Sequence, residues 1–224
     1  MKNNVKIKKP VLIVLSVLNL IVSVIYVFNL PKTVPVHFNM NWECDSIGSR
    51  WVGLVVPFIC MLMVPFMNWS AKNMKNADDN KKPMNIIGTV ITGFLIVLNW
   101  FVLSVMGSGA AIGERIDGFE WVLILAFGVL FVVLGNYMPT VRQNDMLGIR
   151  IPCTLNNEKC WNATHRFSGK LYVVFGLLSI IAAFVLKLTN VEETMIYVLP
   201  LLMIIMFTVV GIIPIIYAIK HKND

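Results

Sequence analysis

Long apolar segments alternate with short charged segments along the whole chain. An apolar run of about 18 or more residues is long enough to cross the hydrocarbon core of a bilayer as a helix. The chain contains six such runs, at residues 11–30, 51–71, 84–106, 121–138, 171–189 and 195–219. The fifth run contains one charge, Lys187, near its end, where a long side chain can reach the interface. The pattern therefore predicts an all-α, polytopic membrane protein with six transmembrane helices.

The composition agrees with this pattern. Apolar residues make up 57% of the 224 residues and charged residues only 14%, whereas soluble domains average about 45–50% and roughly 25%. The mean hydropathy is +0.75. Such a chain has too little polar surface for a water-soluble globule and too few charges for a disordered protein. Its four cysteines are too sparse for a disulfide scaffold.

The net charge of +7, from 19 Lys and Arg against 12 Asp and Glu, is unevenly distributed. Most basic residues lie before the first apolar run, between the second and third, between the fourth and fifth, and after the sixth. Because basic segments stay in the cytoplasm, both termini are predicted to be cytoplasmic. Most acidic residues lie in the intervening outer segments. The basic excess thus indicates topology and attraction to anionic lipid, not nucleic acid, which would require a basic face on a soluble fold.

The apolar runs carry few groups suited to ion transport. Apart from Lys187, Cys60 and tyrosines they hold no ionisable side chain, which disfavours a proton-coupled pump or a charge-gated channel. A Gly109-x-x-x-Gly113 pattern at the outer end of the third run is typical of close helix packing. Prolines and a glycine in the second and sixth runs indicate either simple kinks or broken helices at a substrate site. The second interpretation keeps a transporter of a peptide or lipid-like substrate as the alternative function. These residues are Pro57, Pro65, Pro200, Gly211 and Pro214.

The polar segments contain no established catalytic motif, so we predict no enzyme and no cofactor. His37, His165 and His221 fall in three different segments on both sides of the predicted membrane. His37 with Glu43 and Asp45 is a candidate metal site, but three ligands in one short loop is a weak pattern, and no metal is predicted. An enzyme using His37 with Asp45, or His165 with the adjacent arginine, lacks a second acid or nucleophile.

Two cysteines, Cys153 and Cys160, lie in the polar segment between the fourth and fifth runs. Six residues separate them, which is neither a zinc nor a redox spacing. Thiols in the cytoplasm stay reduced. We therefore predict two unpaired thiols.

The inner segment 139–170 is the longest polar connection, and connections of this length are usually functional or disordered. Its apolar and aromatic residues argue against disorder. Its second half has a helical pattern, because Asn156 or Asn157 can cap a helix and Trp161 and His165 lie one turn apart. We expect this helix to continue into the fifth span.

The same segment resembles the signature of the SdpI family. The matching elements are Asn136-Tyr137-Met138-Pro139, Gly148-Ile149-Arg150-Ile151-Pro152-Cys153-Thr154-Leu155 and Trp161-x-x-x-His165-Arg166-x-x-Gly169-Lys170. The outer segment resembles a small domain that often precedes this signature. Its matching elements are Pro35-Val36-His37-Phe38-Asn39, Asp45 and Gly48-Ser49-Arg50. Three residues depart from the family pattern: Trp42 replaces the usual Gly, Cys44 a frequent Pro, and Cys153 a common Trp.

The resemblance implies a multi-pass protein of the bacterial cytoplasmic membrane. The family is named for an immunity protein against a secreted killing peptide of spore-forming bacilli, and at least one member is thought to hold a cytoplasmic repressor at the membrane. The implied partners are a secreted toxin peptide on the outer side, a cytoplasmic transcriptional repressor and anionic lipid. We expect two units, an N-terminal pair of helices over residues 1–83 and a four-helix unit over residues 84–224.

The candidate site residues follow from the resemblance and from the predicted topology. The outer, toxin-facing residues are His37, Asn39 and Asp45. The inner loop offers charge, an aromatic anchor and hydrogen-bond donors, the residue types enriched at binding hot spots. The candidate partner-binding residues are Gly148, Arg150, Pro152, Thr154, Trp161, His165, Arg166, Gly169 and Lys170. The alternative is that these residues only shape the loop or meet lipid phosphates.

Overall fold

The computed structural model describes residues 9–39, 41–114, 120–189, 201, 204–206 and 208–221. Five helices are long and apolar enough to cross a membrane, which confirms helices at the first five predicted spans. These helices are α1 (Lys9–Asn29), α2 (Val55–Asn73), α3 (Ala77–Gly107), α4 (Glu120–Tyr137) and α6 (Glu158–Thr189). The sixth predicted span, 195–219, lies partly outside the described residues. Its described part includes a π-helical turn, η3 (Thr208–Ile212), followed by α8 (Ile213–Lys220).

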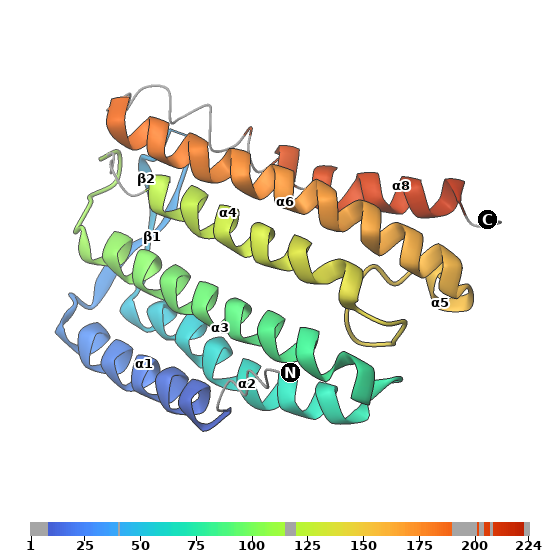
Figure 1. Ribbon diagram of the computed structural model, residues 1–224. Coiled ribbons are helices and arrows are strands. Elements are labelled where there is room, and N and C mark those ends of the chain that lie inside the picture. The colour runs from blue at the N-terminus through green and yellow to red at the C-terminus, as the bar shows by residue number, and fades with distance from the viewer. Residues whose placement is uncertain are drawn as a thin grey trace.

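The long helices lie side by side, and each end of the bundle carries a distinct polar structure (Figure 1). One end, called here the hairpin end, carries β1 (Thr33–Phe38), β2 (Cys44–Ser49) and the short 3-10 helix η1 (Arg50–Leu54). The opposite end, called the loop end, carries η2 (Met138–Thr140), the irregular residues 141–151 and α5 (Pro152–Asn156).

The hairpin is a correction to the all-α prediction. β1 and β2 form a two-stranded antiparallel sheet with Val34 paired to Gly48 and Phe38 to Cys44. The pairing is irregular around His37, where the register shifts. The strands are only six residues long and do not alternate strictly between buried and exposed side chains. The period-two pattern that identifies a strand is therefore too weak to detect in this sequence.

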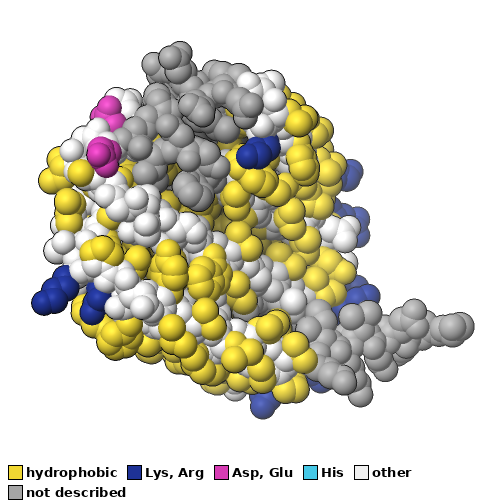
Figure 2. All heavy atoms as spheres, turned by 90° about the vertical axis from the view of Figure 1, so that its left-hand side faces the viewer, with side chains coloured by type: hydrophobic (Ala, Val, Ile, Leu, Met, Phe, Trp, Pro, Cys, Tyr) yellow, Lys and Arg dark blue, Asp and Glu magenta, His cyan; other side chains and the backbone are white. Residues whose placement is uncertain are grey.

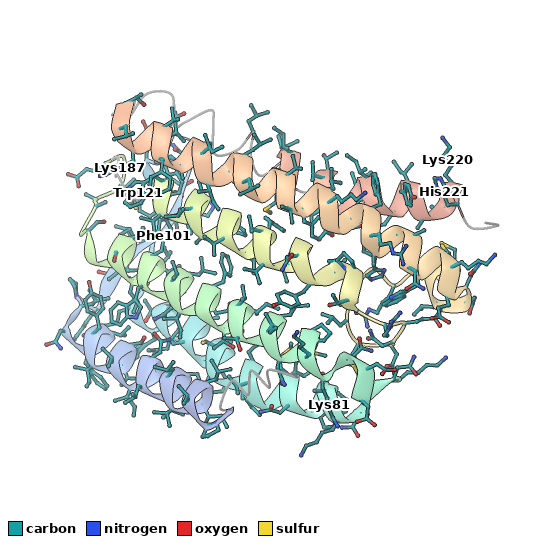
Figure 3. The ribbon with its side chains drawn as sticks, in the orientation of Figure 1. Lys81, Phe101, Trp121, Lys187, Lys220 and His221 are labelled. Atoms are coloured by element: carbon teal, nitrogen blue, oxygen red, sulfur yellow. The ribbon has the colours of Figure 1, made fainter. Side chains whose placement is uncertain are left out.

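The predicted charge segregation is present in the folded chain. Figure 3 shows Lys81, Lys220 and His221 at the loop end and Lys187 and Trp121 at the hairpin end.

The helices α2 and α3 extend the predicted spans at the loop end, so the expected polar connection 72–83 shortens to the turn at Met74–Asn76. Asn76 has a left-handed backbone with φ of 54°, and Asp78 and Asp79 occupy the favourable first turn of α3.

The helices α4 and α6 approach each other through four glycines. A Cβ atom on Gly135 would lie 2.6 Å from the carbonyl oxygen of Gly169, and one on Gly169 would lie 2.7 Å from the carbonyl oxygen of Gly135. Gly128 and Gly176 repeat the arrangement, with corresponding distances of 2.9 and 2.7 Å. Membrane helices associate through small residues that allow close backbone approach. This interface therefore positions α6, and with it the loop end.

The glycine pattern at the outer end of the third apolar run does not form a helix contact. Gly109 and Gly113 lie beyond α3, with φ of 71° and 86°, and a Cβ on either would meet no atom within 4 Å. Glycine is suited to these positions because an L-residue with positive φ is strained. The two residues shape the turn that follows α3 and do not bring helices together.

The helix α1 attaches to the bundle mainly through small and polar residues. Ser16, Asn19 and Ser23 are buried on one face of α1 together with Val27. The side-chain amide of Asn99 on α3 donates to the Asn19 Oδ1 at 3.3 Å and to the Ser23 Oγ at 2.9 Å. Interhelical hydrogen bonds of this kind stabilise membrane helix pairs by about 0.6 kcal/mol on average. They set the position of α1, and so of the hairpin that follows it.

The prolines of α2 do not break the helix. Pro57 lies in its first turn, where a missing amide hydrogen has no intrahelical acceptor to lose. Pro65 lies within a helix that runs from Val55 to Asn73. The helix α3 likewise runs without interruption through positions 83 and 84, where the two predicted units meet.

Candidate functional site

The loop end is built around a buried asparagine on α3. Asn80 is fully buried, and its Oδ1 accepts from the Arg142 amide at 2.9 Å while its Nδ2 donates to the Arg142 carbonyl at 3.2 Å. The same Nδ2 lies 3.1 Å from the carbonyl oxygen of Asn76. One side chain therefore pairs with the backbone of a residue 62 positions later and ties the loop to the helix bundle.

We predict that Asn80→Ala destabilises the loop end. The substitution removes the partner of both Arg142 backbone groups, and a buried polar group left unpaired costs about 1–3 kcal/mol. Proteolysis of the 139–157 loop in detergent should be faster, and the melting temperature lower. The matched control is Asn73→Ala, because Asn73 is exposed and makes one bond to the Trp69 carbonyl. Equal protease resistance of Asn80→Ala and the control would contradict this role of Asn80.

A second buried asparagine closes the loop on itself. The Oδ1 of Asn144 accepts from the amides of Met146 and Leu147 at 2.8 and 2.7 Å, and its Nδ2 donates to the carbonyl oxygens of Arg142 and Leu147. Thr154 has a similar role at the start of α5, where its hydroxyl donates to the Ile149 carbonyl at 2.7 Å. Thr154 also accepts from the Ile151 amide at 3.0 Å. The loop is thus ordered by buried side chains that bond to its own backbone.

Trp161 and His165 form the centre of this structure. Trp161 is fully buried and donates from its indole Nε1 to the Val141 carbonyl at 2.8 Å. The ring of His165 stacks on that of Trp161, with 4.0 Å between the ring centroids, and is 1% exposed. Gly148 lies against both rings with φ of 111°, and a Cβ there would overlap the His165 Nε2. Only glycine fits this position.

The hydrogen bonds of His165 define its protonation. The Nδ1 lies 2.8 Å from the Trp161 carbonyl, which can only accept, so Nδ1 carries the proton. The Nε2 accepts from the Ile149 amide at 3.2 Å, so it carries none. The ring is therefore neutral; its Nδ1 bonds within α6 and orients the ring, and its Nε2 holds the loop against α6.

The sequence-predicted partner-binding residues separate into two groups. The buried or half-buried group consists of Gly148, Thr154, Trp161, His165 and Gly169, and it builds the loop and the helix contact. The exposed group consists of Arg150, Pro152, Arg166 and Lys170. The Arg150 guanidinium donates to the Asp145 carbonyl, and Pro152 begins α5. Only the second group presents side chains on the surface.

The two thiols of the loop end point to one acceptor. The Sγ of Cys153 lies 3.4 Å and that of Cys160 lies 3.6 Å from the carbonyl oxygen of Ala218 on α8. These contacts join α5 and the beginning of α6 to α8. The rings of Phe167 and Tyr217 stack beside them, with 4.2 Å between centroids.

At the hairpin end, the three sequence-predicted residues lie in the turn and strands of the hairpin. The Nδ1 of His37 lies 2.6 Å from the Asp45 Oδ1 in an exposed pair. Asn39 closes the turn, because its Oδ1 accepts from the amides of Asn41 and Glu43 and its Nδ2 donates to the Glu43 carboxylate at 2.7 Å. Among the described residues there is no group of three metal-ligating side chains.

Trp42 has a left-handed backbone with φ of 60°. This is the position at which the resemblance sets a glycine, and the structure shows why glycine suits it. The indole ring packs beside Phe38, with 6.5 Å between centroids, and against the buried cluster of Cys44, Val105 and Ala110. Trp42 therefore combines a strained, left-handed backbone with a side chain that packs against this cluster.

Sequence reasoning missed Arg50 as an organiser of the hairpin end. Its Nη1 donates to the carbonyl oxygens of Phe28 and Leu30 at 3.0 and 2.7 Å. The guanidinium also lies 5.2 Å from the centre of the Trp51 ring. Arg50 therefore caps the end of α1 and holds it against the hairpin. A cation directly after a short strand gave no signal of this role in the sequence.

Two family models match this chain. Residues 140–218 match the SdpI/YfhL protein family, and residues 14–62 match a domain of unknown function (DUF1648). The SdpI/YfhL match thus includes the described loop, α5, α6 and most of α8, and the second match covers most of α1, the hairpin and the beginning of α2. This agrees with the resemblance found in the sequence.

A curated relative is similar over most of both chains. Immunity protein SdpI of Bacillus subtilis (strain 168) is 22% identical over 177 residues, which are 79% of this chain and 82% of the relative. No solved structure matches. Together with the long apolar helices, this similarity makes the chain a multi-pass bacterial membrane protein.

Proposed function

We propose that this protein is a membrane immunity protein that protects its cell from a secreted killing peptide. The observation that carries the proposal is the similarity to Immunity protein SdpI, which spans 79% of this chain. The two family matches also cover both of its polar structures. The lack of a catalytic motif in the sequence is compatible with protection by binding.

In the proposed orientation, six spans place both termini in the cytoplasm, the hairpin end outside and the loop end inside. The described charges support this orientation, because basic side chains from α2, α3, the loop, α6 and α8 gather at the loop end. The hairpin end is then the surface that a secreted peptide meets first. His37 and Asp45 are exposed there, and Asn39 holds the turn between them.

Expression of the chain in a bacterium sensitive to the killing peptide of spore-forming bacilli tests the immunity function. We expect the peptide concentration that halves survival to rise at least about tenfold, which corresponds to about 1.4 kcal/mol. An expression-matched membrane protein of unrelated sequence serves as the control. Unchanged sensitivity of cells that carry the protein in their membrane would overturn the proposed function.

We further propose that the exposed basic residues of the loop end bind a cytoplasmic repressor. Arg150 projects from the loop, and Arg166 and Lys170 project from α6. Buried Trp161 and His165 hold the loop against this helix. Rigid presentation lowers the entropy cost of binding a partner. Contact of the same three side chains with anionic lipid is the alternative outcome of the test.

The double variant Arg150→Ala/Arg166→Ala should insert normally but lose function. We expect protection to fall about tenfold or more, since removing hot-spot arginines costs more than about 1 kcal/mol each. The measurement is survival at matched membrane levels, together with recovery of cytoplasmic protein with the purified membrane fraction. Lys82→Ala is the control, because Lys82 is exposed at the loop end but lies outside the SdpI/YfhL region. Full protection by the double variant, with unchanged recovery of cytoplasmic protein in the membrane fraction, would show that these arginines only meet lipid or solvent.

A further inference from the structure

A pocket at the hairpin end is separate from the residues assigned so far. It has a volume of about 260 Å³ and lies between the hairpin and the end of α3. One wall is formed by Pro31, β1 and β2, and the other by the end of α3 and the turn that follows it. The lining residues include Thr33, Val34, Ile47, Met106, Ala110 and Ala111.

The floor and rim of the pocket differ in character. Val34, Met106 and Ala110 are 2%, 3% and 7% exposed, so they form a buried apolar floor. Ile47, at 44%, and Ala111 are exposed and lie at the rim. No lining residue is charged. The pocket is smaller than the roughly 300–1,000 Å³ typical of sites for small-molecule ligands. It suits a large apolar side chain, such as those that anchor peptides.

The two walls are held together by backbone hydrogen bonds. The Cys44 amide donates to the Glu114 carbonyl at 2.9 Å, and the Gly113 amide donates to the Cys44 carbonyl at 2.8 Å. Cys44 is 1% exposed, and Val105 and Ala110 pack against it. Two backbone hydrogen bonds therefore join the turn after α3 to the beginning of β2. Because its walls are already fixed, ligand binding to this pocket does not cost the entropy of ordering them.

An acidic group lies directly at the rim. The Glu114 Oε2 accepts from the Ala111 amide at 2.8 Å, which places this carboxylate beside a lining residue. Asp45 and Glu43 carry further negative charge on the neighbouring hairpin. Figure 2 views the hairpin end and shows acidic side chains along one edge, Lys and Arg along another and hydrophobic side chains between them. The Glu114 side of the rim therefore favours a cation next to an apolar anchor, whereas exposed Lys32 lies on the hairpin side between the lining residues Pro31 and Thr33.

We propose that this pocket receives a large apolar side chain of the killing peptide, with a cationic group of the peptide beside Glu114. The proposal rests on the proposed immunity function and names the surface that recognises the peptide. The combination of a small preformed apolar pocket and one adjacent carboxylate specifies a peptide with an apolar residue and a neighbouring basic residue. A purely apolar ligand would make no use of the carboxylate.

Site-specific labelling tests the proposal after the protein has folded. Ala111→Cys and Ile112→Cys are made in parallel. Ile112 is the matched control, because it is adjacent and 68% exposed but does not line the pocket. Intact cells are treated with a membrane-impermeant maleimide, with and without purified killing peptide of spore-forming bacilli. We expect the peptide to slow labelling at position 111 at least about fivefold and to leave position 112 within about twofold, since only the first thiol lies in the anchor pocket.

Survival after labelling provides the functional readout. A bulky maleimide on the Ala111→Cys protein should abolish protection, and the same group on the Ile112→Cys protein should leave protection intact. Glu114→Gln keeps the hydrogen bond to the Ala111 amide and removes the charge, so its protection should fall about threefold, more at low than at high salt.

Two results would contradict different parts of the proposal. Equal labelling at position 111 with and without peptide, in cells that remain protected, would show that the peptide does not bind in this pocket. The immunity function would then remain intact. Absence of protection by the unmodified protein would instead overturn the immunity function.

Discussion

Gly135→Ala should separate α4 from α6 and lower the stability of the protein. The new Cβ would lie 2.6 Å from the Gly169 carbonyl oxygen and 2.7 Å from the Val173 amide nitrogen, both of them backbone atoms. Neither atom can turn aside as a side chain would, so the helices must move apart. Overpacking of this kind costs about 1–3 kcal/mol or more. At about 2–4 °C per kcal/mol for a chain of this size, we expect the melting temperature in detergent to fall by about 2–12 °C.

Gly93→Ala is the control for this experiment. Gly93 also lies within a long helix, but a Cβ there would meet no atom within 4 Å. Alanine is favoured over glycine in a helix interior by up to about 1 kcal/mol, so the control should be neutral or slightly stabilising. A Gly135→Ala protein as stable as the Gly93→Ala protein would mean that α4 and α6 are not in backbone contact.

Gly148→Ala should disrupt the loop end through His165. The variant has to place a Cβ where the His165 Nε2 now lies and adopt φ of 111° with an L-residue. The backbone strain costs about 1–3 kcal/mol and the clash a similar amount. The Ile149 amide also loses its acceptor if the ring moves. We expect faster proteolysis of the loop and a loss of protection in the survival assay, at unchanged insertion.

Gly113→Ala separates the cost of backbone strain from the cost of the steric clash in Gly148→Ala. Gly113 also has a positive φ, of 86°, but has open space around its Cβ position, so its substitution includes the strain without the clash. A double-mutant cycle with His165→Ala isolates the contact itself. The cost of Gly148→Ala should be smaller in the His165→Ala background. Identical costs in both backgrounds would show that Gly148 does not act through this ring.

Periodicity and length were sufficient to locate α1, α2, α3, α4 and α6, because an uninterrupted apolar run has no other low-energy structure in a bilayer. The continuation of the 158–170 helix into the fifth span could also be predicted, since nothing between Glu158 and Thr189 stops a helix. The hairpin could not be predicted from pattern, because its strands are short and one of them is shifted in register at His37.

The candidate residues of the inner loop could be located from the sequence, but the sequence did not reveal which of them bind a partner and which build the fold. Trp161 and His165 stand out in the sequence as residue types that bind partners, and the structure buries both inside the protein. Their main contacts, Val141 and Gly148, are 20 and 17 residues away in the chain. Asn80 is 62 residues from the loop that it binds. Such long-range pairings leave no periodic signal, so only the fold reveals which residues face inward.

The length of α6 has a mechanical consequence. A helix of 32 residues is about 48 Å long, whereas the hydrocarbon core of a bilayer is about 30 Å thick. The glycine contacts with α4 lie at positions 169 and 176, in the middle part of this rod. Because α6 is held near its middle and extends on both sides, the helix can tilt about these contacts. A tilt of α6 about these contacts would move its beginning opposite to its end, and the loop and α8, which are hydrogen-bonded to Trp161, His165 and Cys160, would have to move with it.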